Sequence, residues 1–150
     1  MNKIDVQKRV LKNGEPLSCD LFQWDEKTKT FSSTEFGLTI DFVGIEGCTF
    51  TTRYDCTFKT ESGCTFTVGG VTLDTPPLFF SGSRYGIGFI RPGWIKSGCI
   101  EKPVEWWKDN IVRCAKEHNY TPQQVKEYTL YVDFIVAWME LLGIDKEIEK

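Results

Sequence analysis

The chain has 150 residues, of which 41% are hydrophobic and 14% aromatic, and its formal net charge is −3. This length and composition predict one folded domain, residues 1–150, and not a disordered chain. The negative charge excludes an extended nucleic-acid surface, and no apolar run reaches the roughly 18–20 residues that span a bilayer. Because the first twelve residues lack the apolar stretch of a secretory signal, we expect a cytoplasmic protein.

Short strands are predicted from the start of the chain. Apolar residues in 4–10 predict a first strand that ends at the Asn-Gly turn of residues 13–14. Residues 22–31 predict a hairpin, because two apolar segments flank a polar turn. Residues 38–42 alternate apolar and polar side chains, as a half-buried strand does.

A repeat of eight residues follows. Cys-Thr-Phe begins at Cys48, Cys56 and Cys64. This period suits one short strand and one tight turn per unit, and it is too short for a helical repeat. Side chains alternate along a strand, so the Cys and Phe of each unit share one face. With residues 40–42 as a fourth unit, the pattern predicts two buried rows: Ile40, Cys48, Cys56 and Cys64, and Phe42, Phe50, Phe58 and Phe66.

Two arrangements of these octads are open. Consecutive units can pair antiparallel as a meander, or two octads can form one coil of a small β-solenoid that stacks identical residues. We favour the meander, because four units give only about two coils. The predicted fold is therefore α+β, with a β-rich part in residues 1–100, octads at 40–71 and a helical hairpin in 101–150.

Two helices are predicted after residue 100. Pro103 suits a first helical turn, and five residues then share one stripe: Val104, Trp107, Ile111, Cys114 and His118. The second helix has a clear start, since Thr121 is followed by proline and, three residues on, by Gln124 of a capping box. Gly143 is a natural stop.

The second helix is apolar on more than one face. Either it lies between the sheet and the first helix, or part of it is a subunit interface. We expect a homo-oligomer whose interface includes Tyr131, Phe134, Ile135, Trp138 and Leu142.

The six cysteines are 29, 8, 8, 35 and 15 residues apart, so no close pair resembles a zinc motif. We expect free thiols, no metal and no cofactor. Cys114 and His118 lie one helical turn apart and are within reach as a nucleophile pair, but a core thiol beside a helix-capping histidine is the alternative. We expect no enzymatic activity, because no other catalytic constellation is present.

A basic, glycine-rich segment is the candidate ligand site. Residues 75–100 contain no acidic residue and carry a charge of +3, so the other 124 residues carry −6. Glycines let backbone N–H groups approach an anion, and arginine can grip a phosphate. The candidate residues are Arg84, Tyr85, Gly86, Arg91, Trp94 and Lys96. The alternative is a glycine-rich hairpin with solvated cations.

Residues 10–17 and 24–33, followed by the octads, resemble small accessory proteins of bacteriophages and prophages that carry C-T-F-x-T-G-x-x octads. The resemblance covers residues 8–70, and residues 96–99 and 120–124 are also similar. This chain has few octads and often replaces their Thr-Gly turn, as at 52–53 and 60–61. The resemblance implies a phage protein acting in the host cytoplasm, and it carries no catalytic residues.

Three functional hypotheses follow. The first is a stoichiometric binding protein that blocks or sequesters a host defence factor, as a homo-oligomer. The second is a sponge that binds a phosphate-containing nucleotide signal through residues 81–96. The third is a minor virion or assembly protein. None of the three has a membrane as partner.

Overall fold

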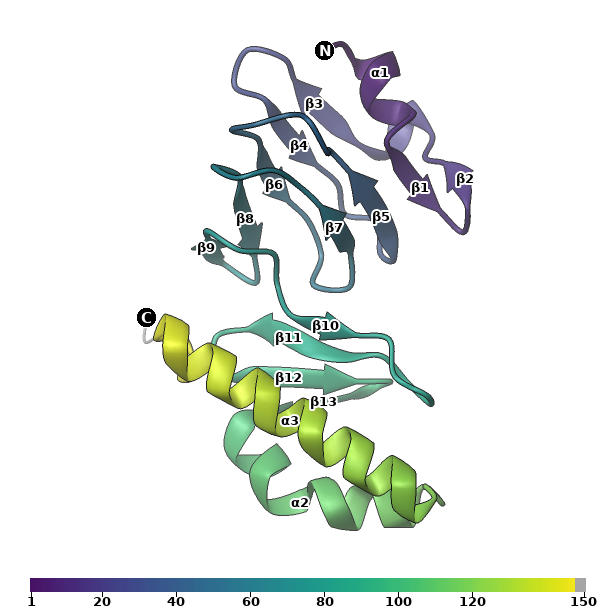
Figure 1. Ribbon diagram of the computed structural model, residues 1–150, viewed down its shortest axis with the longest axis vertical. Coiled ribbons are helices and arrows are strands. Elements are labelled where there is room, and N and C mark those ends of the chain that lie inside the picture. The colour runs from purple at the N-terminus through teal and green to yellow at the C-terminus, as the bar shows by residue number, and fades with distance from the viewer. Residues whose placement is uncertain (148–150) are drawn as a thin grey trace. The chain divides into compact units, whose positions relative to one another are not determined.

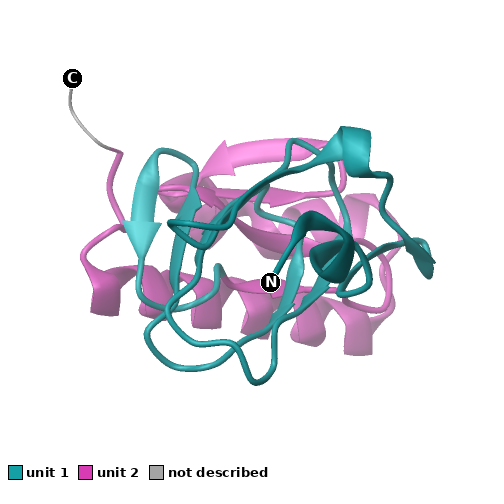
Figure 2. Ribbon diagram, turned by 90° about the horizontal axis from the view of Figure 1, so that it is seen from above, with its two compact units in different colours: residues 1–77 teal, residues 78–150 magenta. Residues whose placement is uncertain are grey.

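The computed structural model describes residues 1–147 (Figure 1). The chain forms two compact units, residues 1–77 and 78–150 (Figure 2). The boundary between the units lies directly after Pro76 and Pro77. It does not lie at residue 100, where the sequence predicts the change from β-rich to helical structure. The reason is that the later strands pack with the helices.

Unit 1 begins with a short helix, α1 (Lys3–Gln7), where the sequence predicts a strand. A capping box explains the difference, because the Asn2 side chain accepts from the Asp5 N–H and Asp5 accepts from the Asn2 N–H. The hairpin β1 (Val10–Lys12) and β2 (Glu15–Pro16) then turns at the predicted Asn-Gly position.

The rest of unit 1 consists of one short 3-10 helix and seven strands. They are η1 (Cys19–Leu21), β3 (Gln23–Asp25), β4 (Thr30–Ser32), β5 (Leu38–Asp41), β6 (Thr49–Thr51), β7 (Thr57–Lys59), β8 (Thr65–Val68) and β9 (Val71–Leu73). The predicted hairpin of residues 22–31 is confirmed as the antiparallel pair β3 and β4.

The octads coil as a short β-solenoid. Strands β4, β6 and β8 pair in parallel in one sheet, and β5 and β7 pair in parallel in the other. From β4 to β8, successive strands therefore alternate between two sheets (Figure 1). The strand orders of these sheets are β3-β4-β6-β8-β9 and β2-β1-β5-β7. This is the solenoid alternative and not the favoured meander. Parallel stacking places Phe31, Phe50 and Phe66 directly above one another.

The aromatic rows differ from the prediction in register. Ile40 aligns with Phe58 across β5 and β7, and not with a cysteine. The predicted row of Ile40 and three cysteines is buried. Phe58, however, is only half-buried, because β7 is the last strand of its sheet.

Unit 2 contains one antiparallel sheet of order β10-β11-β12-β13. Its elements are β10 (Phe79–Phe80), β11 (Ile87–Arg91), β12 (Trp94–Ser97), β13 (Ile100–Pro103), α2 (Val104–Glu117) and α3 (Pro122–Leu142). The capping box of Thr121 and Gln124 and the left-handed Gly143 at φ 71° confirm the predicted bounds of α3.

The helical hairpin covers this sheet (Figure 1), and aromatic side chains contribute to the contact. Trp138 of α3 meets Phe89 of β11 edge to face, with ring centroids 5.4 Å apart. On α2, the Trp107 indole N–H donates to the Ile95 carbonyl at 2.9 Å. The predicted α+β class, with strands followed by two helices, is confirmed. Among residues 1–147, no helix combines the length and the apolar content that a membrane span requires.

Candidate ligand-binding cavity and exposed helix face

A cavity of about 120 Å³ lies within unit 2, between α2, α3, the β12–β13 turn and the loop of residues 81–86. Its lining is mainly apolar and aromatic. The lining residues are Tyr85, Ser97, Gly98, Cys99, Ile100, Trp107, Ile111, Cys114, Ala115, His118, Tyr120 and Tyr128.

The loop of residues 81–86 is fixed over the cavity by α3. The buried Tyr128 hydroxyl accepts from the N–H groups of Arg84 and Tyr85 at 2.9 and 2.7 Å, and it donates to the Tyr85 carbonyl at 2.7 Å. The carboxylate of the preceding residue, Glu127, accepts from the Ser83 N–H at 2.9 Å and from its hydroxyl. These bonds lower the pKa of Glu127, mainly because the Ser83 and Tyr131 hydroxyls donate to the carboxylate.

Glycine is required at position 82 of this loop. Its φ is +64°, a region that side chains rarely adopt. A Cβ atom there would overlap the Tyr128 hydroxyl and the Tyr85 carbonyl. The loop can therefore approach α3 only because residue 82 lacks a side chain.

Burial changes the pKa of two groups in the cavity wall, Cys114 and Tyr120. Burial raises the pKa of the Cys114 thiol, and the nearby Glu117 carboxylate raises it further. Burial also raises the pKa of the Tyr120 phenol, with a smaller contribution from Tyr128. The mainly apolar wall favours a neutral guest inside the cavity, because burying a charge without a partner is costly.

Cys114 and His118 are adjacent but are not arranged as a nucleophile and base. His118 Nδ1 lies 2.8 Å from the Cys114 carbonyl oxygen, so this nitrogen carries the proton and donates to the end of α2. The Cys114 Sγ is 3.8 Å from the same nitrogen. A thiol with a raised pKa beside a donating nitrogen is a weak nucleophile.

Arg84 supplies positive charge at the edge of the cavity. Its guanidinium lies 4.7 Å from the centre of the Tyr120 ring, and Nη2 donates to the His118 carbonyl at 3.3 Å. Tyr85, the next residue, is about half exposed and forms part of the wall. Arginine carries five N–H donors, so the bond to His118 uses one of them.

The structure separates the predicted ligand residues into two groups. Arg84, Tyr85 and Gly86 precede β11, whereas Arg91 and Trp94 lie at its other end, about 13 Å away at 3.3 Å per residue. Arg91 is also bonded to Glu101, with 2.8 Å between Nη1 and Oε1, and lies 4.2 Å from the centre of the Trp94 ring.

Lys96 lies between these groups, opposite Gly88 in the sheet. The predicted six residues therefore do not surround one anion. The aromatic wall supplied by Trp107, Tyr120 and Tyr128 is absent from the prediction. Its signal in the sequence was the eight-residue spacing of the two tyrosines, which places them on either side of the helix start.

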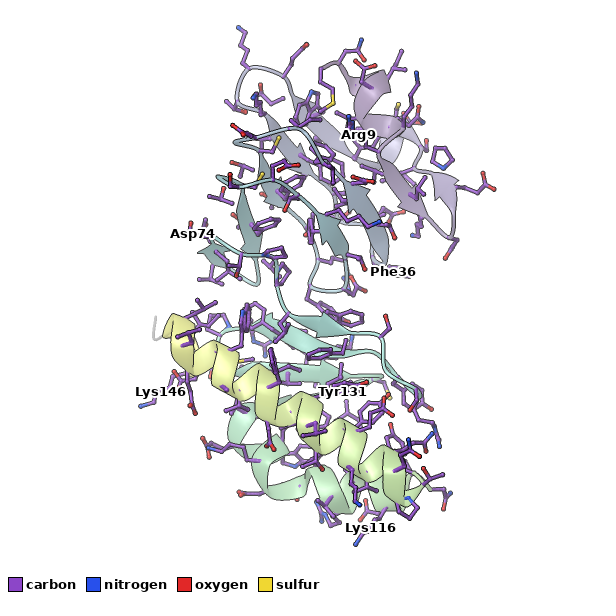
Figure 3. The ribbon with its side chains drawn as sticks, viewed as in Figure 1. Arg9, Phe36, Asp74, Lys116, Tyr131 and Lys146 are labelled. Carbon is purple, nitrogen blue, oxygen red and sulfur yellow. The ribbon has the colours of Figure 1, made fainter. Side chains whose placement is uncertain are left out.

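The predicted interface residues on α3 differ in burial, and only some of them are exposed. Ile135 is fully buried in unit 2, Tyr131 stacks on Phe80 at 4.7 Å, and Trp138 is half-buried (Figure 3 labels Tyr131). Phe134 and Leu142 are exposed by 58% and 38%.

An exposed stripe on α3 includes two leucines that the prediction leaves out. Leu130 is 67% exposed and Leu141 is 82% exposed, and Ala137 lies exposed between them and Phe134. Residues 130, 134, 137 and 141 follow one another at intervals of four, three and four. We call this set the α3 stripe.

All six cysteines are free thiols, and no three His, Cys, Asp or Glu residues in the described part of the chain are grouped to hold a metal ion. Comparison with family models, with curated proteins and with solved structures gives no match. The site is therefore interpreted from its own geometry.

Proposed function

We propose that this protein is a non-enzymatic binding protein of phage type, which blocks or sequesters a host defence factor in the bacterial cytoplasm. In this proposal it acts as a homo-oligomer assembled through the α3 stripe. The observation that supports it is the exposure of Leu130, Phe134 and Leu141 on one face of a 21-residue helix. The host target rests on the sequence resemblance.

The spacing of the stripe favours a second copy of α3 as its partner. Intervals of four, three and four are those of core positions in a coiled coil, where each side chain enters a hole on the facing helix. In an antiparallel pair, Leu130 faces Leu141 and Phe134 faces Ala137 of the other copy. A large side chain thereby meets a small one. Burying an exposed Leu or Phe side chain contributes about 1.5–3 kcal/mol.

Sedimentation analysis tests this assembly. We expect the unchanged protein to be oligomeric at micromolar concentration and Phe134→Glu to be monomeric, because a carboxylate in the seam loses its hydration. Val112→Glu is the matched control, since it puts the same group in place of an exposed apolar residue of α2, outside the α3 stripe. A monomeric unchanged protein, or an oligomeric Phe134→Glu variant, contradicts the proposal.

Titration tests the stoichiometric action. A captured host factor is assayed with increasing amounts of the purified protein. We expect inhibition to end at a fixed molar ratio, because each copy occupies one target. Complete inhibition at a small fraction of one copy per target indicates turnover and contradicts the proposal.

A sponge for a nucleotide signal is the second candidate, and the position of Arg84 beside Tyr120 favours it. Ligand that binds only the folded state raises the melting temperature. We expect cyclic pyrimidine nucleotides to raise it in the unchanged protein and in Arg91→Ala, but not in Arg84→Ala. If Arg84→Ala and Arg91→Ala lose the rise in melting temperature equally, the cavity is not the binding site. If no nucleotide raises the melting temperature of the unchanged protein, the sponge function is contradicted.

A further inference from the structure

We propose that the cavity in unit 2 binds a single six-membered aromatic ring, either as a free phenol-type compound or as the base of a pyrimidine nucleotide. The inference is independent of assembly through the α3 stripe. For the nucleotide candidate it specifies which part of the ligand enters the cavity.

The size of the cavity sets the upper limit for the guest. An apolar protein cavity of about 150 Å³ holds one benzene molecule. The cavity here measures about 120 Å³, somewhat less than that, so one six-membered ring is the largest guest that we expect it to hold. A purine has nine ring atoms, half as many again as benzene, and exceeds this space. The volume therefore selects single rings over fused ones.

The wall offers ring faces and edges to such a guest. Trp107 and Tyr128 are exposed by only 2% and 1%, so their rings are held in place by the packing of unit 2. Tyr85 and Tyr120 complete the aromatic part of the wall. Aromatic rings prefer offset or edge-to-face contact at 4.5–7 Å between centroids. Tyr120 and Tyr128 already meet at 5.1 Å and 69°.

The polar groups near the cavity determine which part of a guest can form hydrogen bonds. The Tyr128 hydroxyl bonds three backbone groups of the loop, so the loop and not the guest occupies it. Arg84 lies beside Tyr120, where it can face a phosphate attached to the guest. The half-exposed Tyr85 next to it gives the cavity access to solvent.

Saturation-transfer NMR with three probes, phenol, uridine monophosphate and adenosine monophosphate, tests the proposal. We expect phenol or uridine monophosphate to bind, and adenosine monophosphate to bind at least tenfold more weakly than the better of the two. Ala115→Leu places three more carbon atoms into the wall and should abolish binding. Val112→Leu is the control, because residue 112 lies on the exposed side of the same helix and should retain binding.

Arg84→Ala separates the two sources of the ring. If it weakens uridine monophosphate at least tenfold but leaves phenol unchanged, the guest is a pyrimidine nucleotide. If phenol binds and uridine monophosphate does not, the guest is a free aromatic compound. Cys114→Leu fills the same space should Ala115→Leu fail to fold, as judged by its amide spectrum.

Three results overturn the inference: no binding of either single-ring probe, adenosine monophosphate binding as tightly as they do, or unchanged binding in a folded cavity-filling variant. Sedimentation of Ala115→Leu keeps this test separate from assembly. We expect the variant to show the same oligomeric state as the unchanged protein, because residue 115 is buried away from the α3 stripe.

Discussion

Replacing Phe50 by alanine should remove a large part of the stability of unit 1. Phe50 is fully buried and lies at the centre of the solenoid core. Its ring stacks on Phe66 at 5.4 Å and meets Phe42 and Phe58 edge to face at 5.0 and 5.5 Å. Phe50 belongs to the middle strand of β4-β6-β8 and contacts Phe58 of β7, so it joins the two sheets of the solenoid.

The expected loss is about 3–5 kcal/mol, the usual cost of a buried Phe→Ala change. A unit of 77 residues has a total stability of roughly 4–12 kcal/mol at 0.05–0.15 kcal/mol per residue. The variant therefore retains little margin. Phe50→Leu is a milder version that keeps the unit folded for measurement, with a loss below that of the alanine variant.

Urea unfolding followed by fluorine NMR of 5-fluorotryptophan measures this loss in the correct unit. Of the five tryptophans, only Trp24 lies in residues 1–77, so its signal reports unit 1. Phe58→Ala, at a half-buried ring, should lose less than Phe50→Ala. Phe36→Ala is the control, because its ring is 58% exposed (Figure 3), and it should lose under about 1 kcal/mol. A loss at Phe50 below 1 kcal/mol, or one smaller than at Phe58, refutes the stacked register.

Three further predictions concern the loop and the thiols. Gly82→Ala should detach the loop of residues 81–86 from α3 and speed tryptic cleavage after Arg84. Gly37→Ala is the control, because Gly37 has a similar φ of +68° but no atom near its Cβ position, and it should not change this cleavage rate. Equal cleavage rates in the two variants contradict the close approach of Gly82 to Tyr128. With a thiol reagent, the exposed Cys99 should react first, and the buried Cys48, Cys56 and Cys64 should react only when the protein unfolds. Since three of the six cysteines are buried, fast reaction of four or more thiols in the native protein argues against the buried row. Burial raises the pKa of Cys56 from its ordinary 9.0 to about 11, so its contribution to stability is complete below pH 9 and is lost as pH rises toward 11. The expected decrease in the free energy of unfolding is about 2–3 kcal/mol, measured by urea titrations at the two pH values. This decrease should be smaller in Cys56→Ala and unchanged in Cys99→Ala. An unchanged decrease in Cys56→Ala contradicts its assignment to Cys56.

Local patterns in the sequence determined the elements whose signals are complete within a few residues. Thr121 and Gln124 satisfy each other's backbone groups, and Gly143 ends the helix, so α3 could be predicted with its bounds. The octads likewise contain enough alternation to specify short strands with cysteine and phenylalanine inward. The capping box at Asn2 and Asp5 is equally local, but the prediction of a strand there rests on the apolar residues of 4–10 alone.

Pairing and proximity were decided only by the tertiary structure. An octad presents the same inward face in a meander and in a solenoid, so its sequence does not distinguish antiparallel neighbours from parallel ones two strands apart. In the same way, composition marked residues 84–96 as basic, but strand β11 places Arg84 and Arg91 at opposite ends. The cavity wall comes from residues 85 to 128, which only the packing of α2 and α3 on the sheet brings together. Sequence spacing determines the face on which a side chain lies, whereas its neighbours depend on how whole elements bury their apolar faces.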